Sequence, residues 1–164
     1  MLTRRGITDA RKVAQKLKNK KFEVAFQTRL SRSKDTLKEV LKYHPECKII
    51  ITNDKMIERS YGRLAGKKHN TIIEKYGKKQ FEIWHRSHDT SPPGGESIKM
   101  VEKRVTSFIN ELITFMKRNK VNVAISAHGN SMRPFRKYFE KLSLKQMMEL
   151  ENPWDDYFHY TVNI

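Results

Sequence analysis

The chain has 164 residues and one cysteine, Cys47, which predicts a single domain over residues 1–164 and excludes an internal disulfide and a cysteine-rich metal site. The sequence contains neither an apolar run long enough to span a membrane nor a signal-peptide pattern, so we expect a cytoplasmic protein without a membrane partner. The net charge of +16 fits a lysine-rich solvated surface, a site for small anions or a nucleic-acid-binding surface.

Apolar residues recur along the chain at helical or alternating spacing. The first helical pattern runs from Ile7 to Leu17, with Thr8 as the expected N-cap. The later patterns predict strands over 22–26, 49–51, 121–125 and 157–162, helices around 37–41, 70–76, 79–85, 96–117, 135–142 and 144–150, a turn-rich stretch over 56–66 and a loop over 91–95. Strands that alternate with helices predict an α/β fold with a mostly parallel sheet in three layers.

A polar segment, SAHGNS at 126–131, directly follows the strand predicted over 121–125. His128 therefore lies where a strand gives way to a helix, which is where open α/β sheets bind ligands. The N–H groups of the following helix N-terminus can bind an anion. A histidine at a strand end can equally be a structural hydrogen-bonding group, so the motif alone leaves both interpretations open.

Five segments spread over the chain show a common resemblance. They read FQTRLSR at 26–32, IERSYGRLAG at 57–66, EKYG at 74–77 followed by WHRS at 84–87, PPGGES at 92–97, and HGNSMR at 128–133. In this order they resemble the motifs of the 2,3-bisphosphoglycerate-dependent phosphoglycerate mutases, within the histidine phosphatase superfamily. The resemblance implies a phosphoglycerate-mutase-like α/β/α fold.

The resemblance also implies a chemistry and a set of site residues. The family moves a phosphoryl group through a phosphohistidine, interconverts 3-phosphoglycerate and 2-phosphoglycerate with 2,3-bisphosphoglycerate as the primer, and uses no metal. Glu58 and His128 would be catalytic, the former as the acid/base for the substrate hydroxyl. Substrate and phosphate would be bound by Arg32, Tyr61, His69, His85, Arg86, Gly129 and Asn130.

We therefore expect a phosphorylated three-carbon acid as the partner, while assembly into a homo-oligomer stays open. The mapping predicts that Glu58, Arg32, Arg86 and His128 converge on one cleft at the carboxyl edge of the sheet. Outside the family pattern, Glu58 beside Arg59 reads as a plain ion pair.

The chain departs from the family pattern in three places. His85 stands where the family has an arginine, and His69 or its neighbours Lys67 and Lys68 stand where it usually has a lysine. The opening strand with its R-H-G-E motif, which carries the nucleophilic histidine, has no counterpart in residues 1–164. We therefore expect these residues to be inactive alone. We also expect the strand over 121–127 to have a hydrogen-bonding edge that is vacant or is filled by another segment or a partner chain.

Three hypotheses follow for the function. The first is a phosphoglycerate mutase, and the second is a related histidine-type phosphatase or a catalytically dead, mutase-like anion-binding protein. The third is a basic nucleic-acid-binding domain, which the densest basic run, over 16–21, does not favour because it has no aromatic side chains for base stacking. An upstream R-H-G-E reading frame would separate the first two, and steeply salt-dependent DNA binding would support the third.

Overall fold

A three-stranded parallel sheet forms the centre of the chain. The computed structural model describes residues 1–163, and its strands β1 (Val24–Gln27), β2 (Ile49–Thr52) and β3 (Val123–Ile125) lie in the order β2-β1-β3. Val24 of the central strand pairs with Ile49 on one side and Val123 on the other. This register brings the carboxyl ends of all three strands to one edge of the sheet.

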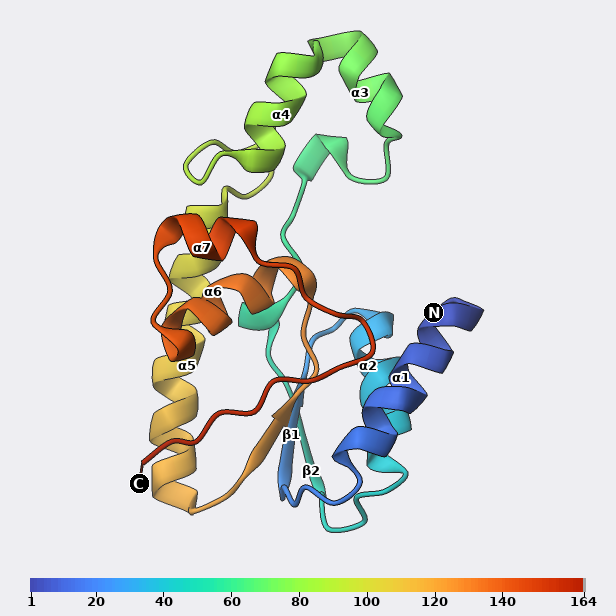
Figure 1. Cartoon of the computed structure of the whole chain (residues 1–164), viewed down its shortest axis with the longest axis vertical. Helices are drawn as coiled ribbons and strands as arrows, with labels where there is room; N and C mark the ends of the chain where they lie inside the picture. Colours follow the sequence, from blue (N-terminus) through green and yellow to red (C-terminus); the bar gives the residue numbers. More distant parts are fainter. Residues whose placement is uncertain (164) are drawn as a thin grey trace.

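Helices cover both faces of the sheet (Figure 1). One face packs against α1 (Arg4–Leu17) and α2 (Ser31–Leu41), and the other against α5 (Ile98–Asn119) and α6 (Gly129–Glu140). The short helix α7 (Leu144–Glu149) packs on α6. The predicted three-layer α/β/α architecture is confirmed.

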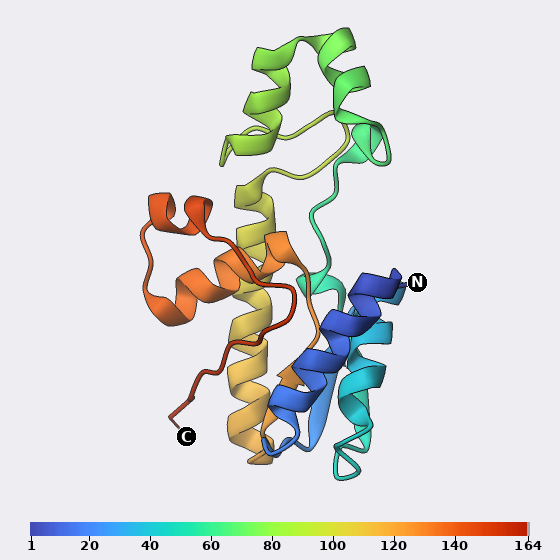
Figure 2. The same cartoon turned by 45° about the vertical axis from the view of Figure 1, so that its right-hand side comes forward.

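A helical lobe, here called the cap (residues 61–87), stands beyond the carboxyl edge of the sheet (Figure 2). It consists of a single 3₁₀ turn, η2 (Gly62–Leu64), with α3 (His69–Tyr76) and α4 (Lys78–Arg86). Leu64, Ile72 and Trp84 form its own small core. The cap is therefore a separate packing unit that two chain segments attach to the body.

The two segments that attach the cap pack backbone against backbone. Glu96 donates its N–H to the Ser60 carbonyl oxygen at 2.8 Å, and a Cβ at Gly95 would lie 2.6 Å from that oxygen. Gly62 has φ +53°, and a Cβ there would lie 2.3 Å from the carbonyl carbon of Gly94. Glycine is required at both positions by this close approach. The loop predicted over 91–95 thus fixes where the cap sits.

The N-cap predicted for the first helix is wrong. The helix begins one turn earlier, because the Thr3 side chain accepts a hydrogen bond from the Gly6 N–H at 3.1 Å. Thr8 lies inside the helix, where its hydroxyl donates to the Arg4 carbonyl oxygen. The apolar periodicity begins at Ile7, so it gave no sign of the polar first turn that Thr3 caps.

The final strand predicted over 157–162 is also wrong. This segment is irregular in the structure and crosses the molecule as an extended coil (Figure 1). Tyr160 packs its ring on Phe139, with the centroids 4.8 Å apart, and its hydroxyl donates to Glu140. The apolar pattern reflects this packing, and within residues 1–163 no neighbouring strand supplies the ladder that a β-strand needs.

One edge of β3 is unpaired within residues 1–163, as the sequence predicts. Along β1 the three residues Val24, Ala25 and Phe26 are buried, whereas all three residues of β3 are only half-buried. β3 thus has the exposure of an edge strand although its sequence reads as an interior one. No helix in the described part of the chain is long and apolar enough to cross a membrane.

Candidate active site

The site begins at the carboxyl ends of β1 and β3, which the parallel register places side by side. Thr28 follows β1 and His128 follows β3, and the Thr28 Oγ1 lies 2.8 Å from the His128 Nε2. Arg32, in the first turn of α2, donates from its Nε to the His128 Nδ1 at 3.1 Å. Residues about 100 positions apart therefore meet at one sheet edge, where α/β folds place their ligand sites.

These two contacts fix the protonation state of His128. Since Nδ1 accepts from an arginine, the ring proton sits on Nε2 and donates to the Thr28 hydroxyl. Burial, and after it the Arg32 charge, lower the pKa of His128 from 6.5 to about 4, although the Glu58 carboxylate partly opposes them. His128 is 6% exposed and neutral at pH 7.

Serine side chains hold the two strand ends together beneath His128. The Thr28 N–H donates to the Ser33 Oγ at 3.0 Å, and that hydroxyl donates to the Ser126 carbonyl oxygen at 2.7 Å. The Ser126 hydroxyl returns a hydrogen bond to the Ser33 carbonyl oxygen at 2.9 Å. The N-terminus of α2, and with it Arg32, is thereby fixed relative to β3.

Glu58 lies across the site from α2, at the N-terminus of α6. Its Oε1 accepts from the Asn130 N–H at 3.1 Å and the Arg59 N–H at 2.9 Å, and its Oε2 lies 4.0 Å from the Arg32 Nη2. A carboxylate is stabilised there by the positive end of the helix dipole. Next to Asn130, a Cβ on Gly129 would meet no atom within 4 Å, so the space over this helix end is open.

Arg104 of α5 supports the segment that carries Glu58. Its guanidinium donates to the carbonyl oxygens of Lys55 and Ile57 at 2.6 and 2.8 Å, and its Nε donates to the Glu96 Oε1 at 2.9 Å. Arg104 is therefore a positioning residue, since it binds the backbone that leads into the cap and the Glu96 side chain that follows the cap.

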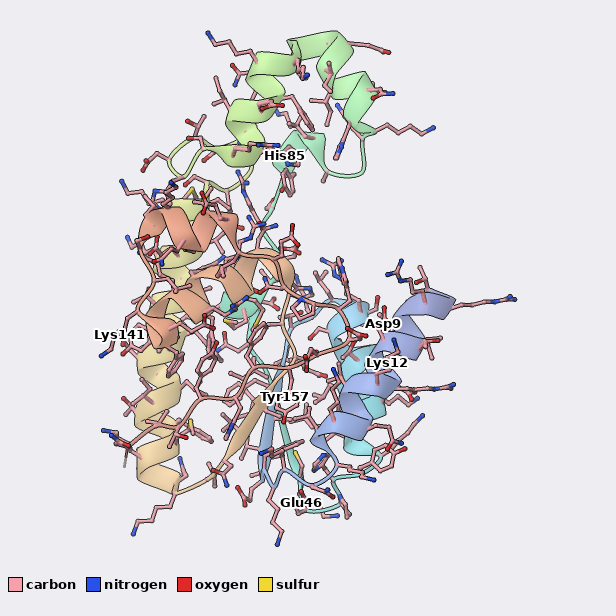
Figure 3. All side chains as sticks on the ribbon, in the orientation of Figure 1. Asp9, Lys12, Glu46, His85, Lys141 and Tyr157 are labelled. Carbon is pink, nitrogen blue, oxygen red and sulfur yellow. The ribbon has the colours of Figure 1, made fainter. Side chains whose placement is uncertain are left out.

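A second group of site residues lies in the cap. The His85 ring is 5.2 Å from the Tyr61 ring and 5.3 Å from the His69 ring, measured between centroids. These side chains line a cavity of about 290 Å³ together with Leu64, Ala65, Gly66, Lys67, Ile72, Phe81 and Trp84. Figure 3 shows His85 at the base of α4, on the side facing η2.

Of the four residues expected in one cleft, three lie together and Arg86 does not join them. Its side chain is 82% exposed on α4, and its nearest carboxylate is Glu82 at 3.9 Å, one helical turn away. The other expected residues fall into two groups, the sheet-edge cluster (Arg32, Glu58, His128, Gly129, Asn130) and the cap pocket (Tyr61, His69, His85).

Arg59 connects the two groups. Its backbone N–H binds the Glu58 carboxylate, while its side chain donates to the Trp84 carbonyl oxygen at 2.8 Å and lies 5.0 Å from the centre of the Tyr61 ring. The side chain is buried, its Nη1 has no hydrogen-bond partner, and burial lowers its pKa. Glu58 thus belongs to the sheet-edge cluster, whereas the side chain of the next residue, Arg59, contacts the cap.

Sequence reasoning missed Thr28, Ser33 and Arg104. Thr28 lies inside the FQTRLSR motif at 26–32, but a hydroxyl residue gives no sign of which distant side chain it will bind. Arg104 could have been noticed as a charged residue beside the inward positions Val101 and Val105 of a long amphipathic helix. The role of Ser33 could not be predicted from the sequence, because it depends on contacts that only the fold creates.

Comparison with known proteins identifies relatives of the whole chain. Residues 1–160 match the family model described as histidine phosphatase superfamily (branch 1). The 2,3-bisphosphoglycerate-dependent phosphoglycerate mutase of Parvibaculum lavamentivorans is 40% identical over 152 residues, covering 91% of this chain and 72% of the relative. The protein of the same name from Rhizobium etli is 33% identical, covering 93% and 74%.

Solved structures agree on the fold. A mycobacterial glucosyl-3-phosphoglycerate phosphatase superposes with a TM-score of 0.77 at 20% identity, covering 92% of this chain and 72% of that structure. The α-ribazole phosphatase of Shigella flexneri gives a TM-score of 0.76 at 19% identity, covering 90% and 71%.

Proposed function

We propose that this chain, which belongs to branch 1 of the histidine phosphatase superfamily, binds phosphorylated three-carbon acids and carries the phosphate site of a phosphoglycerate mutase. The reaction would interconvert 3-phosphoglycerate and 2-phosphoglycerate, with 2,3-bisphosphoglycerate as the phosphoryl primer, as the names of the relatives suggest. The observation that supports this best is the cluster of Arg32, His128 and Glu58 around an open helix N-terminus.

The cluster suits a phosphate group. Arg32 has a half-exposed guanidinium whose planar fork matches phosphate oxygens, and the Gly129 side of α6 offers backbone N–H groups. A bound dianion would offset the cationic field of Arg32 and favour the protonated form of His128. His128 could then donate to a phosphoryl oxygen, while Glu58 exchanges a proton with the substrate hydroxyl.

His128 is not set up as the nucleophile. Attack on phosphorus needs an unshared nitrogen lone pair aimed at it, whereas the Nδ1 lone pair of His128 accepts from Arg32 and its Nε2 carries a proton toward Thr28. In the family pattern the nucleophile belongs to an R-H-G-E strand, and residues 1–164 contain no such motif. We therefore propose that residues 1–164 bind phosphate and phosphoglycerate but do not interconvert the phosphoglycerates.

The second candidate is a catalytically dead, mutase-like binding protein or a related phosphatase. The two engaged nitrogens of His128 favour the binding role for residues 1–164 taken alone. Both candidates share the phosphate site and differ in whether a nucleophile can complete it.

The test adds the strand that the open edge of β3 can accept. We expect residues 1–164 to bind inorganic phosphate and 3-phosphoglycerate in calorimetry, with no mutase turnover and no phosphohistidine. A variant extended at its N-terminus by an apolar strand ending in R-H-G-E should gain turnover and stability, and the same extension ending in R-N-G-E should gain stability only. Turnover by residues 1–164 alone, free of host enzyme, would refute the assignment of His128, and absence of phosphate binding would refute the site.

A further inference from the structure

A segment that reads ENPWDDYFHY, here called the strap (residues 151–160), passes from one face of the sheet to the other. Tyr157 packs against the apolar cluster beneath α1 and α2, as Ala124 of β3 does. Three residues later, Tyr160 packs against the cluster beneath α5 and α6, as Val123 of β3 does. The strap therefore rounds an edge of the sheet. Figure 1 shows it crossing in front of β3, whose outer edge is unpaired in the described part of the chain.

The strap covers this edge with side chains and forms no β-ladder on it. Within residues 1–163 no backbone hydrogen bond joins the strap to β3. Even so, none of the three β3 residues is exposed, whereas three of the four residues of β2, the strand at the other edge of the sheet, are exposed. An uncovered strand edge is a template on which another strand can pair. The strap therefore blocks pairing at β3.

Aromatic contacts hold the strap to α6. The Arg136 guanidinium lies 4.2 Å from the centre of the Phe158 ring and donates to the Glu151 carbonyl oxygen at 3.1 Å. Further along the strap, the Tyr160 ring stacks on the Phe139 ring, with the centroids 4.8 Å apart and an angle of 17° between the planes. The stacked rings bury apolar surface, so salt does not screen this contact.

Exposed ion pairs fasten the strap to α1. Lys12 pairs with Asp155 at 3.1 Å, and Lys16, one helical turn further along, pairs with Asp156 at 3.2 Å. All four side chains are at least 42% exposed, and the neighbouring Trp154 is 84% exposed. Ion pairs in water contribute little each and weaken further in salt. The attachment to α1 is therefore the weaker of the two.

We propose that the strap is an autoinhibitory cover of the β3 edge, which opens from the α1 side and admits an extended apolar strand that pairs with β3. Opening breaks the two ion pairs and withdraws the Tyr157 ring, while the contacts with α6 stay in place as the hinge. The admitted strand supplies the ladder that the strap lacks, because an edge strand presents a row of unpaired N–H and C=O groups. The ion pairs and rings that act here lie outside the proposed phosphate site.

Limited proteolysis measures the opening. Chymotrypsin cleavage after Tyr157 requires the strap to leave the body, whereas cleavage after Phe108, which is 1% exposed, reports global unfolding. In D155N/D156N we expect cleavage after Tyr157 to be roughly three- to tenfold faster at low salt, with no change after Phe108. At about 1 M NaCl the unaltered chain should approach the double variant, because salt screens the ion pairs.

The matched control is E149Q/E151Q. It removes the same charge from exposed carboxylates that lie outside the two ion pairs, and it should leave the cleavage after Tyr157 unchanged. Cleavage at the same rate in D155N/D156N and in the control would overturn the proposed latch.

An added strand tests whether opening uncovers β3. The probe is an uncharged peptide of alternating valine and threonine, about six residues long, which favours the extended conformation. Hydrogen exchange of residues 123–125 is measured with and without the peptide. We expect the peptide to slow this exchange by roughly threefold or more in D155N/D156N relative to the unaltered chain and the control. Exchange in β2, whose outer edge no described residue pairs, should respond equally in all three chains. An equal response of residues 123–125 in all three chains, or none in any, would show that the strap does not gate this edge.

Discussion

The sheet-edge cluster and the cap pocket each contain histidine, but they hold it in opposite ways. His128 has both ring nitrogens in hydrogen bonds and is buried in the body, with its pKa at about 4. His85 and His69 are held by aromatic contacts alone within the described residues, in a lobe with its own small core. A histidine fixed at both nitrogens acts at neutral pH as a donor of fixed tautomer, whereas one held only by its faces keeps both ring nitrogens free to bind a ligand.

The two regions also differ in how much their polar groups contribute to the stability of the fold. Where β1, β3, α2 and α6 meet beneath the cluster, four polar residues are buried, so their polar groups must all be paired: Thr28, Ser33, His128 and Ser131. The cap pocket is lined mostly by apolar and aromatic side chains, and its polar groups face the cavity without needing a protein partner. Substitutions in the cluster should therefore cost stability, and substitutions in the pocket should chiefly change binding.

The largest expected effect comes from Arg104, which holds the junction between the two regions. Arg104→Leu leaves the Glu96 carboxylate and the carbonyl oxygens of Lys55 and Ile57 without their donor, so we expect a loss of about 3–5 kcal/mol in the free energy of unfolding. Urea denaturation measures this loss. Lys103→Leu, on the exposed side of the same helix, is the matched control and should change little. Equal effects of the two substitutions would show that Arg104 does not support the junction.

The next effect sharpens the contrast in protonation. Folded His128 has its pKa at about 4 against an ordinary value of 6.5, so the unfolded chain binds a proton that the folded chain does not. Its contribution is fully present above pH 6.5 and is lost as the pH falls toward 4, by roughly 3 kcal/mol in all. Denaturation of the unaltered chain and of His128→Gln over this range should show the difference. Parallel stability–pH curves would contradict a neutral, buried His128.

The sequence predicted the body of the molecule better than it predicted the contacts of the site. Alternating periodicities gave the layers because each element buries one face, and the HGNS motif gave His128 because a strand-to-helix junction is visible locally. Thr28 could not be assigned a role, since its partner lies 100 residues away. Arg86 was expected in the cluster from its place in a motif, but the direction of a side chain on α4 depends on how the cap is seated.

The strand expected over 157–162 failed for a related reason. Its residues have a pattern suitable for a strand, but a strand also requires a neighbour, and the outer edge of β3 is unpaired within residues 1–163. Local sequence records the preference of a segment, whereas pairing depends on residues elsewhere in the chain. The open edge itself was predictable, because the family pattern places a strand there that residues 1–164 do not contain.

The smallest of the three stability effects tests whether hydrogen bonding at both nitrogens, rather than burial alone, distinguishes His128 from the cap histidines. Thr28→Val keeps the shape of the side chain and removes the hydroxyl that accepts from Nε2, so a buried N–H is left unpaired. We expect a loss of about 1–3 kcal/mol in the free energy of unfolding, measured by urea denaturation at pH 7.5. Thr52→Val is the matched control. Thr52 lies on the exposed strand β2, and its hydroxyl accepts from the Gln27 side chain, so water can replace the hydroxyl when it is removed. A Thr28→Val variant as stable as Thr52→Val would mean that burial alone sets the state of His128, and the contrast with the cap would then rest on depth in the fold.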